Sequence, residues 1–360
     1  MGEPTRALAW AALADAALPT PVAVALLRAL GSPEAVLDAP RARIAAVAGS
    51  AIALRLATRD PGREAAARAW LGDPAHRLIA WEDEAYPRSL LDLPDPPLVL
   101  YAIGRLELFA RPAIAIVGSR QATPQGVEDA GAFAHTLACA GLTVVSGLAQ
   151  GIDAAAHRGA LEAPASTIAV VGTGLDRVYP ASHRDLAKAI ATRGLLVSQF
   201  APGTPPLKAN FPMRNRLIAG LARGVLVVEA APGSGSLITA RLAVEQGRDV
   251  FAIPGSIHSP LSKGPHRLIR DGAKLVETAQ DVLAELGLPA IGAAAGSPAV
   301  ADVDPTLARL FDAMGTGPVD LDRLVARSGL SPERLAASLV QLELDGRVAA
   351  LPGGRWQRLR

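Results

Sequence analysis

Seven short apolar segments between Ala113 and Leu286 limit the folds open to this chain. They read AIAIVG, TVVSG, STIAVVG, LLVSQF, GVLVVEA, DVFAIPG and AKLVE, and helix-like stretches separate them. Near-continuous apolar strands at this spacing are typical of a parallel sheet that helices cover on both faces. We therefore predict an α/β protein whose core, residues 113–286, is Rossmann-like with a mostly parallel sheet.

The flanking segments differ in composition from this core. Residues 1–75 are rich in Ala and Leu at helical spacing and are interrupted by Pro and Gly, which predicts a small domain of short helices. Residues 76–112 contain Tyr86-Pro87 and Asp95-Pro96-Pro97, so we expect an extended connector packed on the core. Residues 287–304 lack periodicity and are predicted to form a flexible linker.

The last segment, residues 305–360, has the pattern of a third unit. Three helices are expected at 305–312, 321–328 and 331–344, and residues 346–359 then predict a β-hairpin around Pro352-Gly353-Gly354. Three helices and a hairpin indicate a winged helix-turn-helix. The helix expected at 331–344 contains one basic residue, Arg334, and two glutamates. It therefore lacks the basic character of a helix that reads duplex DNA.

Composition excludes several classes of protein. The 360 residues are sufficient for two or three domains, and 50% of them are apolar while 19% are charged, as in a globular chain. No apolar run is long enough for a membrane span, and we recognise no signal peptide, so we expect a cytoplasmic protein that does not bind membranes. The single cysteine, Cys139, excludes an internal disulfide framework, and the six histidines show no metal-ligand spacing. We expect no metal and no cofactor.

Glycine-containing loops follow several of the predicted strands. Gly118, Ser119 and Arg120 follow the first strand, Gly147 begins the loop after the second, and Gly172–Asp176 follow the third. Gly233–Thr239, which include Gly235 and Ser236, follow the fifth. Since ligands bind beyond the carboxyl ends of strands in open α/β sheets, these loops predict an anion site that uses backbone N–H groups and helix N-termini. The alternative is that the glycines only form tight strand-to-helix turns.

A segment with basic but no acidic residues lies beside these loops. From Leu186 to Val228 there are six Lys or Arg residues and no Asp or Glu. The predicted ligands within it share one loop and helix start after the fourth strand; they are Lys208, Phe211, Arg214, Asn215 and Arg216. Donors beside an aromatic ring suit a nucleic-acid backbone whose bases stack. The alternative is a solvated basic helix face.

Catalytic interpretations have less support. No loop carries the lysine and hydroxyl of a nucleoside-triphosphate P-loop, and none has an intact G-x-G-x-x-G dinucleotide motif. Ser236 lies in G-S-G-S-L, which is not a hydrolase nucleophile elbow. His157 lies one helical turn from Asp153, where an acid–base pair is one possibility and a histidine that steadies the loop is the other. We therefore expect no catalytic residues.

Six motifs in order resemble the DprA/Smf family, the DNA-processing proteins of bacterial transformation. They are Gly118-Ser119-Arg120, SGLAQGIDAAAH (146–157), GTGLDRVYP (172–180), FPMRNRLIAGL (211–221), VVEA (227–230) and SGSLITARLAVEQGRDVFAIPGS (234–256). The resemblance covers the whole predicted core and the connector before it.

This resemblance implies a non-enzymatic protein that binds and protects single-stranded DNA and helps to load the RecA recombinase onto it. It implies a homodimer through the Rossmann-like domain, a SAM/HhH-like helical domain at the N-terminus and a winged helix at the C-terminus. The implied phosphate ligands are Gly118, Ser119 and Arg120, with Lys208, Phe211, Arg214 and Asn215 around the same groove.

Two other functions remain open at this point. One is a Rossmann-like phosphoribohydrolase that cleaves nucleotides, although its P-G-G-x-G-T-x-x-E signature corresponds here to Pro232–Ala240, which has no glutamate. The other is a transcription factor that reads duplex DNA through residues 305–360 and uses the core only to dimerise.

Overall fold

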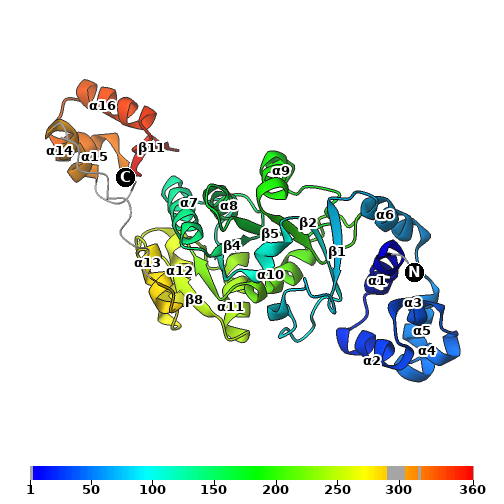
Figure 1. Cartoon of the computed structure of the whole chain (residues 1–360). Coiled ribbons are helices and arrows are strands. Elements are labelled where there is room, and N and C mark those ends of the chain that lie inside the picture. Colours follow the sequence, from blue (N-terminus) through cyan, green and yellow to red (C-terminus); the bar gives the residue numbers. More distant parts are fainter. Residues whose placement is uncertain (1–2, 290–304, 315–317, 360) are drawn as a thin grey trace.

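The computed structural model describes residues 3–289, 305–314 and 318–359. Figure 1 shows N-terminal helices α1–α6, a central sheet with helices on its faces, and a C-terminal unit of helices and a hairpin. The bounds of the six N-terminal helices are α1 Glu3–Asp15, α2 Thr20–Leu30, α3 Pro33–Asp38, α4 Arg41–Ala48, α5 Ser50–Ala57 and α6 Pro61–Leu71.

The central sheet has nine strands in the order β1-β2-β6-β5-β4-β3-β7-β8-β9. All seven predicted core strands are present. They are neighbours in the sheet, in the order β6-β5-β4-β3-β7-β8-β9, and each pair of neighbours is parallel. These seven are β3 Ala113–Val117, β4 Thr143–Ser146, β5 Thr167–Val170, β6 Leu195–Ser198, β7 Gly224–Val227, β8 Asp249–Ala252 and β9 Lys274–Leu275. The expected mostly parallel α/β core is thus confirmed.

Helices cover both faces of the sheet, as the apolar strands require. Along β3, Ala113, Ala115 and Val117 face the cluster with α10 and α11, while Ile114 and Ile116 face α7, α8 and α13. Burial of one large aliphatic side chain contributes about 1.5–3 kcal/mol, so apolar residues on both faces hold each strand in place. The core helices are α7 Pro124–Cys139, α8 Ile152–Leu161, α9 Arg184–Arg193, α10 Asn210–Leu221, α11 Gly235–Glu245, α12 Lys263–Arg270 and α13 Ala279–Glu285.

The strand order reverses beside β3. The next strand in sequence, β4, pairs with one side of β3, whereas β7 pairs with the other side. The crossover helices therefore diverge at this place and leave a crevice at the carboxyl ends of the strands. We call this end of the sheet the carboxyl edge and the opposite end the amino edge.

Residues 76–112 form more than an extended connector. They contain β1 (His76–Ala80) and β2 (Val99–Gly104), which pair antiparallel with each other, and β2 also pairs antiparallel with β6. Two short 3₁₀ helices, η1 (Arg88–Leu90) and η2 (Leu106–Ala110), flank β2. The prolines of this segment lie between the strands, so they mask the strand signal without interrupting any strand.

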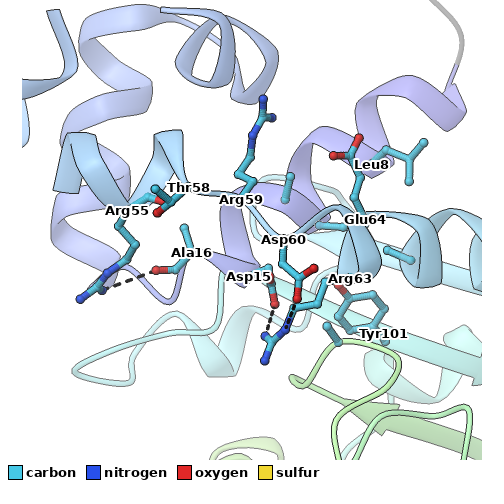
Figure 2. A pocket seen from close by; sticks show the side chains of 14 residues that line it. Leu8, Asp15, Ala16, Arg55, Thr58, Arg59, Asp60, Arg63, Glu64 and Tyr101 are labelled. Atoms are coloured by element: carbon cyan, nitrogen blue, oxygen red, sulfur yellow. Dashed lines mark hydrogen bonds and ion pairs between the residues drawn. The ribbon is translucent and has the colours of Figure 1, made fainter. Parts of the chain in front are cut away.

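The N-terminal helices pack on the antiparallel end of the sheet. Trp10, Leu13 and Leu26 share an apolar cluster with Tyr101 of β2. The backbone N–H of Thr20 donates to Asp95 Oδ1 at 2.9 Å, which ties α2 to the segment before β2. Figure 2 shows a small hollow at this junction, where Arg63 reaches Asp15 at 2.5 Å.

The C-terminal unit is a winged helix, as predicted. Its helices are α14 (Pro305–Met314), α15 (Leu321–Ser328) and α16 (Pro332–Leu344). Strands β11 (Val348–Leu351) and β12 (Arg355–Arg358) form the hairpin, and β10 (Val319–Asp320) pairs with β12. Most of the predicted linker, residues 290–304, lies outside the described residues. Among the described helices, none has the length and apolar character to cross a membrane.

Helices α7 and α8 approach each other through Gly131 and Gly159. A Cβ at Gly159 would lie under 3.0 Å from the carbonyl oxygen of Gly131, whereas a Cβ at Gly131 would lie 3.8 Å from the carbonyl oxygen of Ala155. We predict that Gly159→Ala lowers the free energy of unfolding by about 1–3 kcal/mol through overpacking. The matched change Gly131→Ala should raise it by up to about 1 kcal/mol, because alanine favours helix.

Urea unfolding monitored by tryptophan fluorescence measures both variants against the parent chain. Equal effects of the two substitutions would contradict this close packing of α7 on α8.

Candidate nucleic-acid interface

A pocket of about 630 Å³ lies at the carboxyl edge, where the strand order reverses. Loops after β3, β4 and β7 and the first turns of α10 and α11 form its walls. Eight of the residues predicted from the sequence line it together: Gly118, Ser119, Arg120, Phe211, Arg214, Asn215, Gly235 and Ser236. A smaller hollow of about 50 Å³ adjoins it, shares five of its residues and is also lined by Gly147. We call the two together the switch-point pocket.

Arg120 and Phe211 present the accessible binding groups of the pocket. The Arg120 side chain is exposed, and its guanidinium carbon lies 5.7 Å from the centre of the Phe211 ring. Among the described residues, no acceptor forms a hydrogen bond or ion pair with this guanidinium. Tyr179 packs beside Phe211 with ring centres 5.7 Å apart. A cation with free donors therefore lies next to an aromatic surface that nucleobases can stack on.

Arg214 lies below this surface and is only 4% exposed. Its Nη1 donates to the carbonyl oxygen of Gly147 at 2.6 Å and to that of Val170, and its Nε donates to Asn215 Oδ1 at 3.1 Å. Burial lowers the pKa of Arg214 to about 10, so the group keeps its charge at neutral pH. A side chain at Gly147 would collide with this guanidinium, which explains glycine there.

Asp153 holds the loop after β4 from the other side. Its Oδ2 accepts hydrogen bonds from the backbone N–H groups of Gly147 at 3.1 Å and Ala149 at 3.3 Å. Burial raises the pKa of Asp153, and the charge of Arg214 opposes this shift. Among the described residues that line the pocket, Asp153 is the one acidic group, and it is buried. The accessible surface therefore favours anions.

Two buried histidines fix Leu148, which has a left-handed backbone at φ 59°. The N–H of Leu148 donates to His157 Nε2 at 3.2 Å, and its carbonyl oxygen lies 3.0 Å from His183 Nδ1. The Thr167 hydroxyl donates to the carbonyl of Val144, so His157 Nδ1–H donates to Thr167 Oγ1 at 2.7 Å. His157 thus steadies the loop, as the structural alternative predicted, and its ring has no free position for acid–base chemistry.

Two further carboxyl-edge loops are tied to each other. The N–H of Ser119 donates to the carbonyl of Glu229 at 2.6 Å. The Glu229 carboxylate accepts from the Thr123 N–H at 2.9 Å and hydroxyl at 2.6 Å, at the start of α7. Burial raises the pKa of Glu229. This carboxyl group is therefore used to hold the loop that presents Arg120.

Helix α11 points its N-terminus at the pocket. Gly233, Ser234, Gly235 and Ser236 line the wall, and the Ser234 side chain caps the helix by accepting from the Ser236 N–H at 3.3 Å. The first turn of a helix carries partial positive charge, which attracts phosphate oxygens. Asn215 Nδ2 donates to the Gly235 carbonyl at 3.4 Å and joins α10 to this turn.

Lys208 and Arg216 do not line the pocket. Lys208 is exposed in the loop just before α10. Arg216 points elsewhere: its Nη2 donates to Gln199 Oε1 at 2.8 Å, and its Nη1 donates to the carbonyl of Asp95. Residues two apart on a helix do not share a face, so Arg214 and Arg216 diverge. Arg216 was predicted to bind DNA phosphate, and the structure places its side chain outside the pocket.

The pocket residues that were not predicted from the sequence include Gln121, Gln150 and Tyr179. Gln121 and Gln150 line the larger part, and Gln150 and Tyr179 line the smaller one. Tyr179 and Gln150 lie within two quoted motifs, GTGLDRVYP (172–180) and SGLAQGIDAAAH (146–157), so their positions were the available signal, whereas Gln121 lies in none. Within the described parts of the chain, no group of three His, Cys, Asp or Glu residues is placed to hold a metal ion.

The buried His157 gives a pH-dependent prediction. Its pKa is lowered to about 3, mainly by burial, while that of an unfolded histidine is about 6.5. Between these values the unfolded chain binds a proton that the folded chain does not, so this contribution to stability is complete above about pH 6.5 and is lost as the pH falls. The destabilisation caused by His157→Gln should therefore shrink by about 2 kcal/mol from pH 7 to pH 5.

Urea unfolding of both proteins at several pH values measures this difference. The shared carboxyl groups contribute equally to both proteins. A difference independent of pH would show that His157 is not buried in its neutral form.

Comparisons with known proteins identify the family of the chain. Residues 77–287 match the family model described as DNA recombination-mediator protein A, and residues 293–354 match the DprA winged helix domain. Protein Smf of Escherichia coli is 44% identical over 298 residues, which cover 81% of this chain and 79% of that protein.

Two solved structures are similar as well. DNA processing protein A of Streptococcus pneumoniae has a TM-score of 0.67 at 41% identity and covers 76% of this chain and 95% of its own. DNA processing protein A of Helicobacter pylori, described for its single-stranded DNA binding mode, has a TM-score of 0.54 at 32% identity and covers 58% of this chain and 95% of its own. The chain belongs to the DprA/Smf family of DNA-processing proteins.

Proposed function

We propose that this protein binds single-stranded DNA in the switch-point pocket and acts as a non-enzymatic mediator of recombination during transformation. The observation that carries the proposal is the pairing of an uncommitted guanidinium, Arg120, with the Phe211 ring above the buried charge of Arg214. Phosphate contacts supply affinity, and an aromatic ring accepts any base. The single-stranded DNA binding mode described for the Helicobacter pylori relative supports the same ligand.

The enzyme alternative has no support from the pocket. A phosphoribohydrolase requires a glutamate where Ala240 stands, and Ala240 is buried in the apolar core. The titratable groups around the pocket, Asp153, His157 and Glu229, are all engaged in hydrogen bonds that fix loops. Binding is the chemistry that this arrangement serves.

The wider role includes RecA. We infer that a homodimer formed through the Rossmann-like core protects the bound strand and helps to load RecA onto it in the cytoplasm. Family membership as a recombination mediator supports this role.

Strand exchange by RecA on DNA coated with single-strand-binding protein should accelerate on addition of this chain, and light scattering should give twice the monomer mass. An unchanged strand-exchange rate would contradict the loading role.

The direct test of binding is Arg120→Ala. Loss of charge-assisted contacts to one phosphate should weaken binding of a labelled oligothymidylate about 10-fold or more in fluorescence anisotropy. The slope of log K against log salt should become shallower by about 0.7. Lys208→Ala should give a smaller loss, since Lys208 lies outside the pocket.

Arg193→Ala is the matched control, because it also removes one exposed arginine, at a place outside both parts of the pocket. Arg193 ends α9, directly before β6, and so lies at the amino edge. We expect wild-type affinity for this variant. Equal losses for Arg120→Ala and Arg193→Ala would show a diffuse attraction instead of a pocket.

A further inference from the structure

Arginines stand before three adjacent strands at the amino edge, on the side of the sheet opposite to the switch-point pocket. Arg111 precedes β3 by two residues, and Arg223 and Arg248 directly precede β7 and β8. These strands are neighbours in the order β3-β7-β8. Since adjacent strands lie about 4.8 Å apart, the sheet brings the three arginines into a row.

The row borders a cleft of about 570 Å³. Arg88, at the start of η1, lines the same cleft and adds a fourth guanidinium group. The half-buried ring of Phe109 contributes an aromatic surface to the wall. We call this the amino-edge cleft. It shares no residue with the switch-point pocket.

These guanidinium groups form few hydrogen bonds or ion pairs within the protein. Arg88 and Arg111 are exposed, and their guanidinium groups form no hydrogen bond or ion pair with the described residues. The guanidinium group of Arg223 donates once, to the carbonyl of Leu286 at 3.2 Å. Arg248 Nη2 lies 3.9 Å from Asp92, and its Nε is buried without an acceptor among the described residues. A buried donor without a partner is costly, so this site lacks an acceptor.

The acidic residues of the cleft leave a positive excess. Glu84 and Glu107 are the acidic residues among the described residues that line it. Glu107 Oε1 already accepts from Arg105 Nε at 2.8 Å, and this hydrogen bond lowers the pKa of Glu107. With Asp92 beside Arg248 and Arg105 beside Glu107 included, three carboxylates stand against five guanidinium groups, and this excess favours an anionic ligand. Planar guanidinium groups match the paired oxygens of phosphate.

From this arrangement we infer that the amino-edge cleft binds the phosphodiester backbone of a second stretch of the same DNA strand. The inference rests on the proposed function. Helix α10 connects the two sites: Phe211 in its first turn lines the switch-point pocket, and Leu221 at its end lines the cleft. Its 12 residues span about 18 Å, which a long strand can bridge, whereas a strand only as long as one site takes has too few nucleotides left to fill the second.

The test compares a labelled oligothymidylate of about six nucleotides with one of about thirty, since a single-strand-binding OB-fold domain, taken as a guide, occupies about 4–16 nucleotides. The double variant Arg88→Ala/Arg111→Ala should bind the long strand about tenfold more weakly, and its salt slope should be shallower by about 1.4. Its affinity for the short strand should be unchanged. The matched control Arg41→Ala/Arg43→Ala removes two exposed charges from α4 and should bind both lengths as the parent does.

The outcomes separate this inference from the proposed function. If the parent chain binds no single strand, or if Arg120→Ala has no effect on the short one, the proposed function fails. If both hold and the Arg88/Arg111 variant binds the long strand as the parent does, the cleft does not contact the strand.

Inorganic phosphate, thymidine monophosphate and polyglutamate serve as further probes in thermal shift experiments. Stabilisation of the parent but not of the variant by phosphate or the mononucleotide, with unchanged long-strand affinity, would assign the cleft to a free phosphate ligand. The same result with polyglutamate alone would assign it to an acidic protein segment. Either result would overturn the inference.

Discussion

The switch-point pocket depends on one buried charge, the guanidinium of Arg214. Its hydrogen bonds reach the carbonyls of Gly147, after β4, and Val170, at the end of β5, and the side chain of Asn215, which in turn contacts Gly235. One side chain thus joins two strands to the starts of α10 and α11. A buried charge is costly unless hydrogen bonds satisfy it, so the surrounding backbone must keep this arrangement. The loops are therefore fixed before any ligand arrives.

Buried and exposed groups have different roles in this pocket. Buried Arg214 supplies positive potential from below, and exposed Arg120 supplies donors that a phosphate can reach. The carboxyl and imidazole groups of Asp153, His157 and Glu229 are used to hold backbone N–H groups and hydroxyls. A rigid surface loses little entropy when a flexible strand binds to it. The same hydrogen bonds leave these titratable groups engaged in holding loops.

Much of the fold was predictable from the sequence for a physical reason. Apolar strands covered on both faces leave a continuous signal, and their topology alone brings the loops of Gly118, Gly147 and Gly235 to one edge. The antiparallel strands β1 and β2 were not predicted, because the prolines around them indicate an extended connector. Arg216 was misplaced because charge in a segment does not reveal helical phase. The neighbours in the sheet that align Arg111, Arg223 and Arg248 follow from strand order, which no local pattern encodes.

The central claim is that single-stranded DNA occupies the carboxyl edge at the point where the strand order reverses. Hydrogen–deuterium exchange of the full chain, with and without oligothymidylate, tests this most directly because it reports on each loop separately. The account predicts slower exchange in residues 118–121, 147–151 and 233–236 when DNA is bound. Protection confined to the winged helix, residues 318–359, with no change in those three loops, would contradict it.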